Sequence, residues 1–262
     1  VSDNVEKANI FNHYFASQCD LPGGADSAQL PYMAPLAGSN ATLELPLFDV
    51  VDVYKILKCL PSGKATSPDQ IGNFILRNCA VSLAEPLYTI FVECVKSATY
   101  PEPWKISNVI PIHKKANRQL VCNYRPISLL CNSSKIFERL LFNSLYTFLK
   151  DNNMLTPLNS GFKKGVSTVN QLIYLVHQIY LGMENKHDVK IIFLDFSKAF
   201  DKVWHMGLLH KLEHIGIAGN LFSLLKSYLS NRKPRVVIDC ATSDIAGIHS
   251  GVPQGSILGP IL

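Results

Sequence analysis

The carboxylate of Asp195 is the first side chain whose position indicates chemistry. It directly follows residues 189–194, a run so apolar that it predicts a central strand covered on both faces. A carboxylate left unpaired there would be costly, so we expect Asp195 to face a cleft, where it could hold a hard cation such as Mg²⁺. Aspartates at strand ends also cap turns and helices, and that structural alternative stays open. For Asp201, in the turn that follows, a local cap is the better interpretation.

The segment 250–260 combines glycines, prolines and one amide side chain. Gly251 and Gly255 permit positive φ angles and the close approach of another backbone. Between them, the amide of Gln254 can contact a substrate that lies against the loop, and Ser256 can cap a helix that follows. A glycine loop alone is a weak signal, so this segment gains meaning only together with the Asp195 region.

A zinc site is the alternative of a different chemical class. His210, Glu213 and His214 satisfy the H-x-x-E-H pattern of one group of zinc peptidases. In a helix, however, Leu208 and Leu212 would belong to the apolar face and both histidines would point the other way. A zinc helix must turn its ligands into a cleft that contains a third ligand. The zinc metallopeptidase therefore remains only a distant alternative.

Amphipathic helices and short extended runs must hold these groups in place. Apolar residues at helical spacing predict helices near residues 5–17, 50–60, 82–94, 136–149, 168–180 and 221–229. Capping boxes predict helix starts at Ser82 and Thr168. Extended runs predict strands at residues 109–112, 189–194, 235–238 and 245–248. Residues 19–47, rich in Pro, Gly, Ala and Ser, indicate a linker. The pattern is that of a mixed chain in which helices outweigh the sheet.

Composition excludes several classes of protein. Of the 262 residues, 47% are hydrophobic and 17% are charged, which favours a large core and excludes a disordered tail, a collagen-like rod and a simple coiled coil. No run approaches the roughly 18 uninterrupted apolar residues of a membrane span. The chain starts without an initiator Met or a signal peptide and stops inside an apolar run, so we expect a fragment of a longer protein.

The charge and the cysteine content of the chain limit the kinds of partner, metal site and cellular compartment that it indicates. The net charge of +5 is compatible with a nucleic-acid partner but is weak evidence, because clustered basic charge is the criterion. Basic clusters occur at residues 114–125, 163–164 and 232–235, and solvated loop side chains explain each cluster equally well. The seven cysteines contain no C-x-x-C pair, so neither a zinc ribbon nor a thioredoxin-like site is supported. Several of them lie among apolar residues, as Cys94 does, and we expect these to be buried thiols in a reducing compartment.

Four strings together carry a family resemblance. They are NYRPISLL at 123–130, GF at 161–162 with G-x-ST at 165–168 and QL at 171–172, FLDFSKAFD at 193–201, and GVPQGS at 251–256. In this order they resemble the reverse transcriptases of non-LTR (LINE-type) retrotransposons, over roughly residues 45–262. Residues 7–15 also resemble the segment that joins the endonuclease of such elements to the polymerase.

The resemblance implies an α+β fold, an incomplete right-hand polymerase with mainly helical fingers and a partial antiparallel palm sheet. It implies the following divisions: an N-terminal extension and linker at 1–47, fingers at 48–158, palm at 159–205, fingers again at 206–250, and a return to the palm at 251–262.

The resemblance also implies the chemistry, which is addition of dNTPs to a DNA primer on an RNA template, assisted by two Mg²⁺ ions, with Mn²⁺ as an alternative. Asp195 would ligate both ions and the backbone carbonyl of Phe196 would help to hold one. Phe200 matches the gate against a ribose 2′-hydroxyl, although it could equally be core. The implied nucleotide contacts are Lys114, Arg125, Phe200, Gln254 and Gly255, and the implied nucleic-acid contacts are Lys163, Lys164, Arg232 and Lys233. For Arg125, a structural ion pair stays open.

The implied partners are an RNA template, a DNA primer, dNTPs and the rest of a polyprotein, with an endonuclease upstream and further palm and thumb downstream. The implied location is the nucleus or a cytoplasmic ribonucleoprotein, without a membrane. The sequence departs from the family in having no Asp-Asp dipeptide, which usually supplies the remaining catalytic carboxylates. One carboxylate cannot hold two metal ions, so we expect this chain to be inactive by itself. A catalytically dead RNA-binding remnant is the second interpretation.

Overall fold

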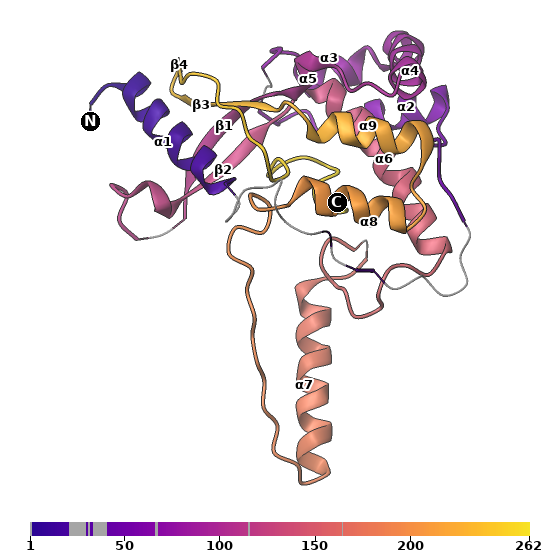
Figure 1. Cartoon of the computed structure of the whole chain (residues 1–262), viewed down its shortest axis with the longest axis vertical. Helices are drawn as coiled ribbons and strands as arrows, with labels where there is room; N and C mark the ends of the chain where they lie inside the picture. Colours follow the sequence, from indigo (N-terminus) through magenta and orange to yellow (C-terminus); the bar gives the residue numbers. More distant parts are fainter. Residues whose placement is uncertain are drawn as a thin grey trace. The chain divides into compact units, whose positions relative to one another are not determined.

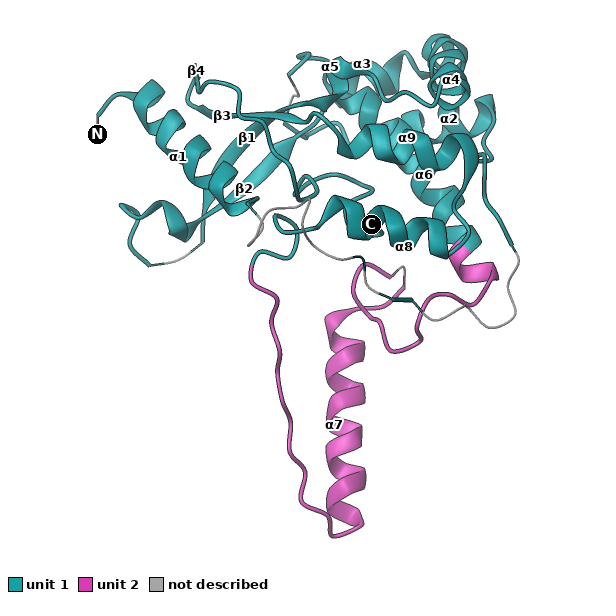
Figure 2. Cartoon of the chain, viewed as in Figure 1, with its two compact units in different colours: residues 1–148, 198–262 teal, residues 149–197 magenta. Residues whose placement is uncertain are grey.

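The computed structural model describes residues 2–20, 30, 32–33, 41–65, 68–114, 116–163 and 165–262. The chain divides into two compact units, Val1–Phe148 with Lys198–Leu262, and Leu149–Ser197 (Figure 2). We call them unit 1 and unit 2 and describe each by itself. Much of the predicted linker, at 21–29, 31 and 34–40, lies outside the described residues.

A four-stranded sheet lies in unit 1, in the order β2-β1-β3-β4. Its strands are β1 Ile106–His113, β2 Tyr124–Leu129, β3 Lys233–Ile238 and β4 Ala241–Thr242. β2 is antiparallel to β1 and β4 is antiparallel to β3, but β1 and β3 run parallel. The extended runs predicted at 109–112 and 235–238 are confirmed, whereas no strand is assigned at 245–248. The parallel pairing of β1 with β3 follows a long, largely helical return of the chain. All four strands lie within the ranges expected to form the fingers, so this sheet does not test the expected antiparallel palm sheet.

The helices of unit 1 are drawn in Figure 1, and most of them contribute side chains to one core of aromatic and aliphatic residues. They are α1 Asn4–Gln18, α2 Val50–Lys58, α3 Asn73–Asn78, α4 Ala80–Lys96, α5 Glu102–Lys105, α8 His205–His214 and α9 Gly219–Leu229, with the 3₁₀ turn Val121–Asn123 and with α6 Asn132–Asp151, which runs on into unit 2. At the centre of the core the rings of Phe91 and Phe137 stack 4.9 Å apart. Tyr100 and Tyr228 meet edge to face, with 5.0 Å between their ring centroids. The fold is therefore α+β with a helical core.

Two helix starts differ from the capping boxes predicted for them. α4 begins at Ala80 and not near Ser82, because α3 leads almost directly into it and leaves no free first turn to cap. In unit 2, α7 Thr168–Glu184 is capped by Ser167 and Asn170. The side chain of Gln171, predicted for the cap, instead accepts a hydrogen bond from Ser160.

Helix α1 covers part of the sheet in unit 1. Ala8 is fully buried against Val109 of β1 and Val236 of β3. The side-chain amide of Asn12 donates to the carbonyl oxygen of Asp244 at 2.7 Å. These contacts bring the end of α1, at Cys19, close to the segment that precedes the glycine loop.

Unit 2 contains α7 and an extended segment that carries Asp195. The predicted central strand at 189–194 is wrong, because this segment pairs with no strand among the described residues and is exposed. Phe193 is 81% exposed and Leu194 is 88% exposed. An apolar run indicates that its side chains favour burial. Burial on both faces, however, requires neighbouring strands, and the described part of the chain supplies none for this segment. Among the described residues, no helix is long and apolar enough to span a bilayer.

Candidate functional site

The loop at 251–256 is fixed on one side by the turn at 198–203. The N–H of Gly251 donates to the carbonyl oxygen of Val203, and the N–H of Val252 donates to that of Phe200, both at 2.8 Å. Gly251 has a φ of +86°, and a Cβ added to it would lie 2.7 Å from the carbonyl oxygen of Asp201. A side chain at position 251 would force the two backbones apart, so glycine is required here.

The other side of the loop rests on β2. The N–H of Ser128 donates to the carbonyl oxygen of Gln254 at 2.8 Å. Gly255 has a φ of +125°, and an added Cβ would lie 2.6 Å from the carbonyl oxygen of Ser128. The structure thus brings Gln254 and Gly255 against the strand that also carries Arg125.

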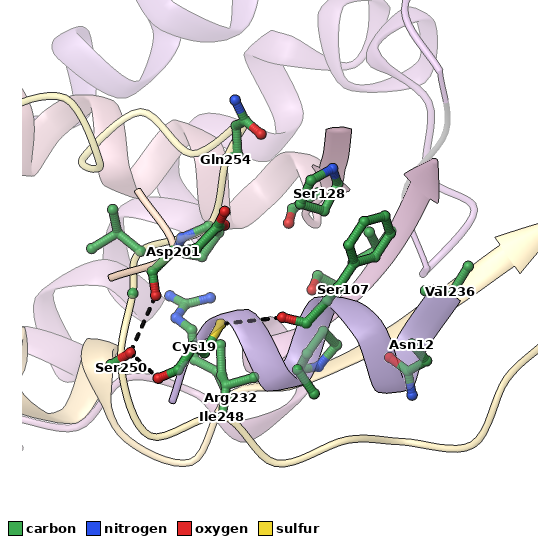
Figure 3. Close-up of a pocket in the computed structure, with 18 residues that line it drawn as sticks. Asn12, Cys19, Ser107, Ser128, Asp201, Arg232, Val236, Ile248, Ser250 and Gln254 are labelled. Atoms are coloured by element: carbon green, nitrogen blue, oxygen red, sulfur yellow. Dashed lines mark hydrogen bonds between the residues drawn. The ribbon is translucent and has the colours of Figure 1, made fainter. Parts of the chain in front are cut away.

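A cavity of about 60 Å³ lies between the loop, the sheet and α1 (Figure 3). Polar side chains reach it from each of these elements: Asn12 from α1, Ser107 from β1, Ser128 from β2, Asp201 from the turn, and Ser250 and Gln254 from the loop region. Its volume is that of about two water molecules. The cavity by itself is therefore too small for a nucleotide, which would have to lie outside it against the loop.

Burial shifts the pKa values of several groups around this cavity. It raises the pKa of the Asp201 carboxyl, an effect that the charges of Lys198 and Lys114 partly offset. Burial, reinforced by Asp201, raises the pKa of the Cys19 thiol to about 12. Burial also lowers the pKa of His205, whose Nε2 lies 2.7 Å from the carbonyl oxygen of Gly251. Asp201 is thus a half-buried carboxyl beside the loop, which the expectation of a simple cap did not reveal.

Lys114 and Arg125 lie on the hairpin formed by β1 and β2. Arg125 pairs in register with Ile112, and the N–H of Lys114 donates to the carbonyl oxygen of Asn123 at 2.8 Å. Both residues are exposed. The hairpin therefore presents two cations beside the strand that holds the loop.

Phe200 combines two structural roles. Its side chain is half-buried and packs against the main core, in agreement with the core alternative. Its backbone carbonyl accepts the hydrogen bond from Val252 of the loop. The ring is consequently held by core packing on a turn that is hydrogen-bonded to the loop.

The proposed metal ligands belong to unit 2. Asp195 is exposed, and Phe196 is 85% exposed. Among the described residues, no three His, Cys, Asp or Glu side chains gather as a metal site. These residues by themselves therefore do not fit a centre for two Mg²⁺ ions.

The four residues expected to contact nucleic acid have different surroundings. Lys163 is half-buried in unit 2, and Lys164 lies outside the described residues. Lys233 is half-exposed and lies 3.5 Å from a carboxylate oxygen of Glu102. Arg232 is only 3% exposed, and its guanidinium lies 4.0 Å from the centroid of the Tyr228 ring. The burial of Arg232 argues against a nucleic-acid contact at this residue.

The H-x-x-E-H segment lies on α8 with its predicted apolar face inward. Leu208, Leu209 and Leu212 are all buried. Among the residues that the structure describes, no cluster of metal-ligating side chains includes His210, Glu213 or His214, so nothing supports the zinc metallopeptidase.

A buried carboxylate that sequence reasoning missed lies on the other side of the loop. Glu138 of α6 is fully buried and accepts hydrogen bonds from the N–H groups of Ile257 and Leu258. The available signal was its place between Phe137 and Leu141 on the apolar face of the predicted helix. A charged residue on such a face must have partners, although the pattern does not say which ones.

Comparison with known proteins agrees with the four strings. The family model described as "Reverse transcriptase (RNA-dependent DNA polymerase)" matches residues 112–262. The "Probable RNA-directed DNA polymerase from transposon BS" of Drosophila melanogaster is 30% identical over 98% of this chain and 29% of its own length. The "RNA-directed DNA polymerase from mobile element jockey" of the same species is 35% identical over 88% of this chain and 25% of its own length.

A more distant relative is the "Retrovirus-related Pol polyprotein from type-1 retrotransposable element R1" of Bradysia coprophila, 28% identical over 76% of this chain and 19% of its own length. The chain spans less than a third of each of these relatives. The family match covers Lys114 and Arg125 of the hairpin and the whole loop with Gln254. The resemblance inferred from the sequence is confirmed, and the chain belongs to the reverse transcriptase family of non-LTR retrotransposons.

Proposed function

We propose that this chain forms the nucleotide-binding part of an RNA-directed DNA polymerase, which extends a DNA primer on an RNA template. The observation that carries the proposal is the fixed position of the loop at 251–256 between the turn at 198–203 and β2. The loop, Lys114 and Arg125 all lie in the part of the chain that matches the family model.

The two exposed cations of the hairpin are suited to the triphosphate. Arg125 can donate two parallel hydrogen bonds to phosphate oxygens, and Lys114 supplies a compact positive charge. Neither Lys114 nor Arg125 belongs to the ion pairs found among the described residues. A bound triphosphate would therefore find both charges available.

The loop and the turn would define the sugar and base side of the same site. The Gln254 amide can donate and accept hydrogen bonds, and Gly255 lets the nucleotide approach the backbone. We assign Phe200 to the gate against a 2′-hydroxyl, because its ring is held beside the loop by core packing. A rigid ring excludes an added hydroxyl group by overlap more effectively than a mobile one.

We assign Asp195 the role of one catalytic carboxylate, with the backbone carbonyl of Phe196 beside it. A pair of Mg²⁺ or Mn²⁺ ions would supply charge stabilisation at the reacting phosphate when bound. That centre needs carboxylates beyond those that the described residues bring together. We therefore propose that the chain of 262 residues binds a nucleotide but does not extend a primer by itself.

The architecture that we propose is a right-hand polymerase, with 48–158 and 206–250 as fingers and 159–205 and 251–262 as parts of the palm. Residues 1–47 would connect to an endonuclease. The name of the relative from Bradysia coprophila contains the word polyprotein, which supports further domains as partners. The proposed substrates are dNTPs, a DNA primer and an RNA template, and the proposed location is the nucleus or a cytoplasmic ribonucleoprotein.

Titration of a fluorescent dNTP into the chain tests this proposal. We expect Lys114→Ala and Arg125→Ala each to weaken binding about tenfold, since each removes a charge-assisted phosphate contact. The matched control is Lys211→Ala, which removes an exposed lysine of α8. The proposal fails if the unaltered chain binds no dNTP, or if the control loses as much affinity as the two hairpin variants.

A second candidate function, RNA binding without catalysis, is favoured by a basic cavity in unit 1. The cavity has a volume of about 660 Å³ and is lined by Lys55, Lys64, Lys135 and Arg139, with no Asp or Glu in its lining. Burial lowers the pKa of Lys135, the charge of Glu138 acts in the opposite direction, and the nearby charge of Lys64 makes a smaller contribution that lowers the pKa. An RNA phosphate in the cavity would relieve this repulsion.

Gel-shift measurements over a series of salt concentrations test RNA binding. The double variant Lys64→Ala, Lys135→Ala should weaken binding and reduce the salt slope by about 1 to 2, because two phosphate contacts are lost. Lys96→Ala, at the exposed end of α4, is the control. Binding that does not depend on salt would exclude this function.

A further inference from the structure

A buried carboxylate holds the backbone that directly follows the glycine loop. Glu138 lies on the inner face of α6 and is fully buried. Its Oε2 accepts hydrogen bonds from the N–H of Ile257 at 2.8 Å and from the N–H of Leu258 at 3.2 Å. Both amides belong to the turn entered from Gly255, so one side chain fixes the exit of the loop.

The charge of Glu138 is partly compensated inside the core. Burial raises the pKa of this carboxyl, while the charge of Arg232 and the two backbone N–H groups act in the opposite direction. The hydroxyl of Tyr100 approaches Oε1 of Glu138 at 3.5 Å. The resulting polar group, which we call the Glu138 network, consists of Glu138, Arg232, Tyr100 and Tyr228.

Only part of the hydrogen-bonding capacity of Arg232 is satisfied within this network. Its Nε donates to the carbonyl oxygen of Tyr228 at 2.9 Å, and its guanidinium lies over the ring of the same tyrosine. Its two terminal nitrogens are buried and have no hydrogen-bond partner among the described residues. Arg232 therefore acts on Glu138 as a nearby charge and not as a hydrogen-bonded ion pair.

Stability alone is a poor explanation for such a network. Replacement of a buried charge pair by apolar side chains of similar volume is often neutral or stabilising. What an apolar pair would not supply is an acceptor for the two amides, which would then be left unsatisfied. The particular contribution of Glu138 is thus to the conformation of the backbone after Gly255.

We propose that Glu138 is a positioning residue for nucleotide addition, acting through the loop that carries Gln254 and Gly255. Hydrogen bonds to Phe200 and Val203 hold the entry side of the loop, and hydrogen bonds to Ser128 and Glu138 hold its exit side. Without the contact to Glu138, the exit side loses two of these hydrogen bonds. This proposal rests on the proposed nucleotide-binding function.

The first test is Glu138→Gln, which keeps the shape of the side chain, removes its charge and leaves the two N–H groups only the weaker, neutral acceptor of an amide oxygen. Amide hydrogen exchange at Ile257 and Leu258 should become about tenfold faster or more, while Phe91 in the core should keep its protection. The affinity for a fluorescent dNTP should fall about tenfold, because Gln254 and Gly255 are no longer fixed. Glu93→Gln, on the exposed side of α4, is the matched control and should change neither readout.

The double variant Glu138→Gln, Arg232→Met separates positioning from stability. It removes both buried charges, so it should recover the melting temperature lost by Glu138→Gln without recovering the dNTP affinity or the protection of the two amides. If Glu138→Gln does not fold, the double variant provides the same two readouts.

Two results would overturn the proposal: unchanged exchange at Ile257 and Leu258 in Glu138→Gln, or recovery of dNTP affinity together with stability in the double variant. If the unaltered chain binds no dNTP, the proposed function fails. Amide exchange then still shows whether Glu138 fixes the loop.

Discussion

The loop at 251–256 and the segment at 189–196 carry the two halves of the proposed chemistry, yet their surroundings differ. The loop is tied to the turn at 198–203, to β2 and to α6 by hydrogen bonds. The segment with Asp195 pairs with no described strand, and Ile192 and Leu194 are 81% and 88% exposed. The comparison teaches that the described residues of the chain fix the proposed nucleotide loop through hydrogen bonds but do not fix the surroundings of Asp195 in the same way.

The apolar surface of unit 2 follows from the same difference. Large apolar side chains of α7 and of the extended segment are exposed, among them Ile173, Tyr180 and Phe193. Contiguous exposed apolar surface favours association. We therefore expect unit 2 to be the part of this chain that promotes association.

The largest effect should come from closing the space that the loop needs. Gly255→Ala places a Cβ 2.6 Å from the carbonyl oxygen of Ser128 at a φ of +125°. We expect a loss of about 2 to 4 kcal/mol in the free energy of unfolding, measured by urea denaturation. Gly247→Ala, where an added Cβ meets no atom within 4 Å, should cost less than about 0.5 kcal/mol. Equal losses would show that the loop does not rest on β2.

Two phenylalanines sharpen the comparison further. Phe200→Ala should cost about 2 kcal/mol, because the half-buried ring packs against the core, whereas Phe193→Ala should cost little, because that ring is 81% exposed. Thermal unfolding measures both. In a dNTP-binding assay, Phe200→Ala should also reduce discrimination against rNTPs. Unchanged discrimination would remove the gate assignment and leave only the packing role.

A smaller effect is expected from the pH dependence of Asp201. Burial raises the pKa of this carboxyl above its ordinary value of 3.8, so the folded state holds the proton more firmly than the unfolded state. The corresponding stability is present below the unfolded pKa and is lost as the pH rises through the folded pKa. Asp201→Asn should therefore lose less stability than the unaltered chain when the pH rises from about 4 to about 7. Parallel melting curves across this range would contradict the assignment.

The smallest effect on stability should come from Asp195→Asn. Because Asp195 is exposed, the free energy of unfolding should change by less than about 0.5 kcal/mol. dNTP binding should also persist, since the proposed contacts lie in unit 1. In any context in which this sequence supports DNA synthesis, the same substitution should abolish synthesis. Residual synthesis in a primer-extension assay would exclude Asp195 as a catalytic carboxylate.

Local patterns predicted much of the fold because they report local preferences. Apolar periodicity located α1, α2 and α9, and β-rich runs located β1 and β3. The same reasoning failed for residues 189–194, since an apolar run cannot tell whether neighbouring strands are present. It also did not predict the parallel pairing of β1 with β3, which depends on a chain return over many residues and on no residue within either strand.

The candidate site also contains features that the sequence predicted and features that it did not predict. The glycines at 251 and 255 were predictable, because their need for positive φ follows from their type and is met in the structure. The contact between Glu138 and the amides of Ile257 and Leu258 was not predictable, because it joins residues far apart in the sequence. Arg232 illustrates the converse, since a residue from a basic cluster lies in the core, stacked on Tyr228. Burial of a single charged residue depends on tertiary contacts that charge patterning does not contain.

Amide hydrogen exchange of the chain with and without a dNTP tests the central claim most directly. Without nucleotide, the N–H groups of Ser128, Val252 and Ile257 should be protected, because each donates a hydrogen bond, whereas residues 189–196 should exchange rapidly. Addition of the dNTP should increase protection at 251–258 and leave 189–196 unchanged. Protection that increases only at 189–196, or at neither region, would contradict a nucleotide site built on the loop.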